Sequence, residues 1–167
     1  MARRTRILYR RCSFTHRGAL RRVHRSAPRV VTLVRRLLYA NLALAILLAG
    51  HVADHTLRQS GTDQLSFVAS LPGLLGVVAV FISLGLVAAG YRLAPQIAGT
   101  IGLLTAVGFV AVHLAPHWSM FSDPYEDRYL DAASWIQMFA SLAGGLLVAF
   151  EARRLLTGPA AGVGGRA

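Results

Sequence analysis

The chain has 167 residues, of which 54% are hydrophobic and only 15% are charged, and its formal net charge is +11. Soluble domains are about 25% charged, so this composition argues against a soluble globular domain. Nucleic-acid binding is also disfavoured, because the basic residues are all arginines concentrated near the start of the chain and no folded reading module accompanies them.

Four apolar runs organise the rest of the chain. A helix needs about 20 apolar residues to cross the hydrocarbon core of a membrane, and it satisfies its own backbone hydrogen bonds there. The runs also lack the alternating pattern of a membrane β-barrel. The sequence therefore predicts an all-α, four-helix transmembrane bundle over residues 30–154. The expected helices cover residues 30–55, 65–91, 93–115 and 132–152.

Residues 1–29 precede the first run and are rich in arginine. We expect a basic arm, either disordered or partly helical, that contacts the anionic headgroups of membrane lipid. Residues 155–167 are rich in Gly and Ala, which predicts a flexible tail. Cys12 is the single cysteine, so no intrachain disulfide can form.

Polar and small residues within the runs predict how the helices pack. Asn41 lies inside the first run, where we expect it to bond to a neighbouring helix. Gly90 and Pro95 flank a short break, which predicts a tight turn and an antiparallel hairpin of the second and third helices. Gly144 and Gly145 are small enough for close helix packing, either within the chain or against a second copy or another membrane protein.

The charges predict the orientation of the bundle. Twelve of the eighteen arginines lie in residues 1–36, and Arg92, Arg153 and Arg154 fall at the same end of the expected helices. Six of the seven acidic residues fall at the opposite end. Cytoplasmic loops carry an excess of arginine and lysine, so we expect a multi-pass protein of the cell membrane with both termini in the cytoplasm.

Two histidine pairs occupy the expected outer end. His51 and His55 close the first run, and His113 and His117 close the third. A spacing of four places the first pair on one face of a helix. The second pair is less regular, because Pro116 biases the residue before it away from helix, so the helix should end before His117.

Several hypotheses follow for this histidine-rich outer cap. One is a zinc or copper site, to which Met120 and Asp123 could also contribute. Others are a haem held between His51 and His113, a proton-linked site, or a purely structural cap. The candidate metal ligands are His51, Asp54, His55, His113 and His117.

No catalytic signature accompanies these histidines. The chain lacks the H-E-x-x-H pattern of zinc proteases, a Gly-rich phosphate loop and a Ser/His/Asp pattern. The sequence therefore favours a non-enzymatic bundle or complex subunit, with a metal- or haem-binding membrane protein as the alternative.

Overall fold

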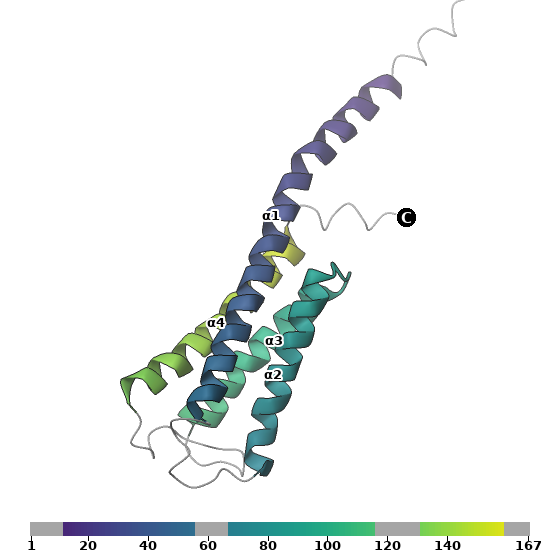
Figure 1. Ribbon diagram of the computed structural model, residues 1–167. Coiled ribbons are helices and arrows are strands. Elements are labelled where there is room, and N and C mark those ends of the chain that lie inside the picture. Colours follow the sequence, from purple (N-terminus) through teal and green to yellow (C-terminus); the bar gives the residue numbers. More distant parts are fainter. Residues whose placement is uncertain (1–11, 56–66, 116–130, 159–167) are drawn as a thin grey trace, which may run out of the picture.

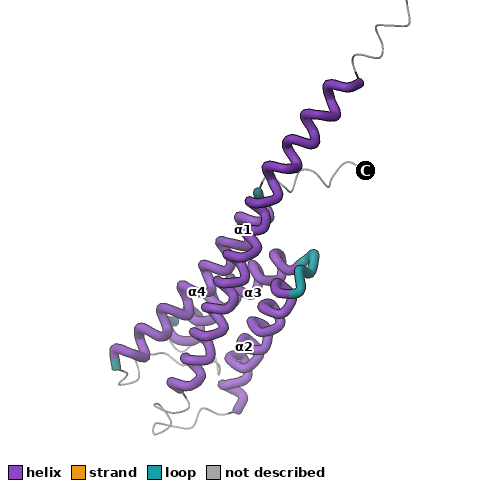
Figure 2. The backbone as a smooth tube through the Cα atoms, turned by 45° about the horizontal axis from the view of Figure 1, so that its top comes forward, coloured by secondary structure: helices purple, strands orange, loops and turns teal. Residues whose placement is uncertain are grey.

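The computed structural model describes residues 12–55, 67–115 and 131–158, and all the regular structure in these ranges is helical (Figures 1 and 2). Four helices follow one another along the chain, and a short π-helix, η2, directly continues the third. No strand occurs in these three ranges. The elements are α1 (Cys12–Ala53), α2 (Phe67–Ala88), α3 (Ala94–Phe109), η2 (Val110–Leu114) and α4 (Ala132–Thr157).

The helices form an up-and-down bundle in which α2 and α4 each pack against both α1 and α3. Figure 1 shows that the C-terminal ends of α1 and α3 lie at one end of the bundle, together with the start of α4. We call this the histidine end. The turn between α2 and α3 lies at the opposite end, and the first part of α1 projects beyond the bundle there (Figure 1).

Helix α1 begins at Cys12 and not near residue 30, so it includes much of the basic arm, which we expected to be disordered or partly helical. Arginine, leucine and alanine are good helix formers, and they make up eight of the 18 residues from Cys12 to Arg29. Helix α4 likewise continues to Thr157, past the start expected for the flexible tail.

The turn between α2 and α3 forms as the sequence predicts. Gly90 has a φ of 67°, and the amide of Tyr91 donates to the carbonyl oxygen of Leu86 at 3.0 Å. This left-handed glycine with a bond back across the last helical turn is a Schellman C-cap. Pro95 then occupies the first turn of α3, where its missing N–H costs nothing.

Close contact between α3 and α4 depends on a pair of glycines. A Cβ atom placed on Gly102 would lie 2.6 Å from the carbonyl oxygen of Gly145, and one on Gly145 would lie equally close to the carbonyl of Gly102. Gly144 faces α1 instead, where an added Cβ would lie 3.1 Å from Leu47. Both glycines of α4 therefore serve packing within the chain.

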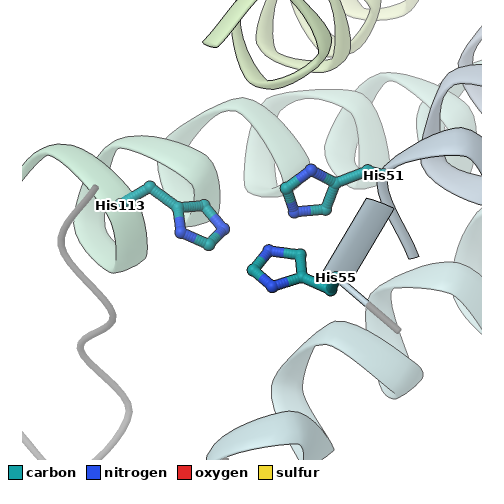
Figure 3. Close-up of side chains that lie close together, drawn as sticks. All are labelled: His51, His55 and His113. Carbon is teal, nitrogen blue, oxygen red and sulfur yellow. The ribbon is translucent and has the colours of Figure 1, made fainter. Parts of the chain in front are cut away.

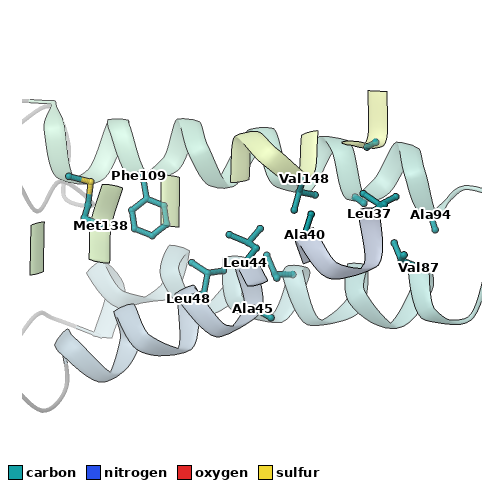
Figure 4. Close-up of a cluster of buried hydrophobic side chains, with 13 residues drawn as sticks. Leu37, Ala40, Leu44, Ala45, Leu48, Val87, Ala94, Phe109, Met138 and Val148 are labelled. Carbon is teal, nitrogen blue, oxygen red and sulfur yellow. The ribbon is translucent and has the colours of Figure 1, made fainter. Parts of the chain in front are cut away.

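A narrow apolar core runs along the inside of the bundle (Figure 4). Leu44, Val80, Met138 and Val148, from α1, α2 and α4, have no exposed surface. Asn41 lies among them, and the predicted bond to a neighbour is confirmed: the hydroxyl of Ser83 on α2 donates to its Oδ1 at 2.8 Å. Its amide nitrogen donates to the carbonyl of Leu37 at 2.9 Å.

The outside of the bundle is apolar as well. Large side chains such as Ile46, Phe81, Leu104 and Ile136 are more than half exposed, and they come from all four helices. A helix that is hydrophobic on all sides suits a membrane. Three helical segments are long and apolar enough to cross one, namely Val30–Ala53, Ala94–Leu114 and Ala132–Thr157.

Candidate metal centre

The last turn of α1 carries two histidines toward the inside of the bundle. His51 is buried and His55 is half-buried, and the spacing of four places both on the same side of the helix. The regular α-helix ends at Ala53, and Asp54 and His55 follow in a wider, π-type turn.

His113 reaches the same place from the end of α3. There the helix widens into the π-helix η2, whose last bond runs from the amide of Ala115 to the carbonyl of Val110 at 2.9 Å. Ala115 itself is extended, with φ −80° and ψ 145°, as expected for the residue before Pro116. Single π-turns of this kind occur frequently at functional sites.

The three imidazoles form one compact cluster, which we call the histidine triad (Figure 3). One ring nitrogen from each of His51, His55 and His113 lies within 4.8 Å of the others. The ring centroids of His51 and His55 are 4.5 Å apart, those of His51 and His113 5.1 Å, and those of His55 and His113 5.5 Å.

Phe109 closes the triad on the side of the bundle core. Its ring centroid lies 4.8 Å from that of His51 and 5.6 Å from that of His113. His51 and His113 are only 8% and 7% exposed to solvent, whereas His55 is the most accessible of the three. The triad therefore has an apolar inner side and a more open outer side.

Helix α4 fixes the position of α1 close to the triad. The side-chain amide of Gln137 donates to the carbonyl oxygen of Leu47 at 2.6 Å, one turn before His51. Gly50 makes room for this contact, because a Cβ at that position would lie 3.2 Å from the amide nitrogen of Gln137. At the start of α4, Asp131 accepts a 3.0 Å hydrogen bond from the amide of Ser134 and so caps the helix.

The structure brings together three of the five residues predicted as ligands. Asp54 is buried in the last turn of α1, but it lies outside the group of close nitrogen atoms. His117, Met120 and Asp123 lie outside the described residues. Phe109 also belongs to the site but was not among the predicted residues, and the available sequence signal was its position four residues before His113.

No family model, curated protein or solved structure matches the chain. The chemistry of the histidine triad therefore has to follow from its geometry.

Proposed function

We propose that the protein is a four-span membrane protein that binds a divalent transition metal ion through His51, His55 and His113. The single observation that carries the metal proposal is the approach of one nitrogen from each imidazole to within 4.8 Å of the others. Zinc binds histidine nitrogen at about 2.0–2.1 Å, which places tetrahedral ligands roughly 3.3 Å apart. Small rotations of the three imidazole side chains would bring their nitrogen atoms to this spacing.

The donor set favours zinc or copper among the available metals. Imidazole suits zinc, copper, iron and nickel, whereas calcium and magnesium prefer oxygen ligands. A haem is less compatible with the geometry, because the ring of His55 lies 4.5 Å from that of His51 and 5.5 Å from that of His113, where the macrocycle would have to extend. Two axial histidines would each point a ring nitrogen at the iron from opposite sides of the porphyrin, with the macrocycle filling the space around them.

Helix α2 completes the bundle as the fourth span in this proposal. Its described apolar part is Gly73–Ala88, and the apolar run in the sequence continues on both sides of it. Leu74, Leu75, Phe81 and Ile82 are more than half exposed, which suits contact with lipid chains. A helix of 22 residues is also long enough to cross the hydrocarbon core.

The arginines support a cytoplasmic location for both termini. Arg35, Arg36, Arg92, Arg153 and Arg154 are all exposed, and they belong to the end of the bundle opposite the histidine triad. By the positive-inside rule this end faces the cytoplasm, so the histidine triad faces outward. The basic residues before Arg35 would then meet anionic headgroups.

Cysteine labelling tests the orientation. Cys12 is the only cysteine, so it should react with a membrane-impermeant maleimide only after the cells are opened. In a Cys12→Ser background, Ser60→Cys should react in intact cells. Labelling of Cys12 in intact cells would contradict the proposed orientation.

Elemental analysis of detergent-purified protein tests the metal. Protein from cells supplied with zinc and copper should contain about one metal ion per chain, and the His51→Ala/His113→Ala double variant should contain none while still inserting into the membrane. His24→Ala, at the other end of α1, is the matched control and should retain the metal. If the purified wild-type protein contains no metal, the proposed metal binding is wrong and the triad is a structural cap.

A further inference from the structure

Among the described residues, the histidine triad offers three ligands, one fewer than a structural zinc site has. Structural zinc sites in proteins are closed by four protein ligands, whereas sites with three protein ligands hold water or a substrate in the fourth position. Within residues 12–55, 67–115 and 131–158, the close group contains three imidazoles and no cysteine or carboxylate. Asp54, the nearest acidic residue in sequence, is not part of it.

The packing around the triad determines where a fourth ligand can approach. Phe109 contacts both His51 and His113 and thereby occupies the side toward the bundle core. A phenyl ring offers no lone pair to a metal ion, so Phe109 supplies no ligand from that side. His55 is the least buried of the three and lies in the π-type turn that follows α1, at the end of the bundle.

We propose that a metal ion in the triad keeps one coordination position open toward the histidine end, where it takes a small exogenous donor such as water, hydroxide or a small anion. This inference rests on the metal binding proposed above. A metal ion in such a site can exchange one ligand with the surrounding medium. Water bound to zinc in such a site loses a proton near neutral pH, so the site would present hydroxide at the outer surface.

Cobalt(II) is the probe that tests the open position, because its visible spectrum reports coordination geometry. The purified protein is stripped of metal, loaded with Co²⁺ and titrated with sodium azide. We expect visible bands in the loaded wild type, and a saturable shift of these bands as azide replaces the bound water. The His51→Ala/His113→Ala variant should show neither the bands nor the shift.

The outcomes separate this inference from the proposed function. Failure of the wild type to bind Co²⁺ would overturn both. Bound Co²⁺ with a spectrum that azide leaves unchanged would overturn the open position alone, because a fourth protein ligand would then close the site. An azide response that appears only in a His117→Ala variant would overturn it as well, and would identify the closing residue.

Discussion

The side-chain amide of Gln137 donates a 2.6 Å hydrogen bond to the carbonyl oxygen of Leu47, and so joins α4 to α1 one turn before His51. The same carbonyl lies four residues before His51, where it is the regular helical acceptor for the His51 amide. The bond therefore holds the stretch of backbone from which His51 and His55 project. Gly50 permits the approach because it has no side chain in the way.

We predict that Gln137→Ala weakens metal binding without abolishing it. The three imidazoles remain, but α1 loses the bond that positions its last turns. Hydrogen bonds between membrane helices contribute about 0.6 kcal/mol on average and up to about 1.7 kcal/mol, which corresponds to a roughly three- to twentyfold loss of affinity. Competition with a chelator of known affinity would measure it.

Gln96→Ala is the matched control for this prediction. Gln96 is exposed in the first turn of α3, at the opposite end of the bundle, and its replacement should leave the affinity unchanged. Equal affinities for wild type and Gln137→Ala would mean that the bond to Leu47 does not position the triad.

We predict that Gly102→Ala destabilises the bundle. The added methyl would lie 2.6 Å from the carbonyl oxygen of Gly145 and 3.0 Å from the side chain of Val148, so α3 and α4 would have to separate. Overpacking of this kind costs about 1–3 kcal/mol. Thermal unfolding in detergent, followed by circular dichroism, should show a lower midpoint.

Gly108→Ala provides the comparison in the same helix. A Cβ at Gly108 meets nothing within 4 Å, and alanine is favoured over glycine in a helix by about 0.5–1 kcal/mol. This variant should unfold at the wild-type temperature or above it. If both variants unfold at the same temperature, the contact between Gly102 and Gly145 does not limit stability.

Much of the fold could be predicted from the sequence because its signals are local. The length of an apolar run indicates a membrane helix, Gly90 and Pro95 indicate the turn, and Pro116 indicates the end of the helix before it. Helix α1 begins earlier than the expected residue 30, because the arginine-rich segment before it has helix-forming residues and no apolar signal. The structure continues α1 back to Cys12.

The lateral arrangement of the helices could not be predicted in the same way. Small residues show that helices approach closely, but not which helices do so. The sequence left open whether Gly144 and Gly145 contact a partner or the same chain, and the structure places them against α1 and α3. Binding to a partner protein stays a prediction that no contact within the chain tests.

The candidate site could be predicted only in part, because the sequence does not show how neighbouring helices meet. The topology placed His51, His55 and His113 at one end of the bundle, but their contact depends on how α1 and η2 meet. The π-turns at both helix ends decide which side chains face inward, and such a turn has no clear sequence signal. Asp54 lies in the same π-type turn as His55, but the close group of possible ligand atoms contains only the three histidines.

The π-helix η2 provides the last prediction, since its width sets the direction of His113. Deleting Ala111 should convert this turn into regular α-helix, which shortens the path from Val110 to His113 by one residue and so changes the direction of the imidazole and its height along the helix. His113 would then leave the triad, and metal binding should fall at least as far as in His113→Ala. Val110→Ala keeps the residue count at an exposed position and should bind metal like the wild type. Equal metal content in the deletion variant and the wild type would show that the π-turn does not direct His113 into the site.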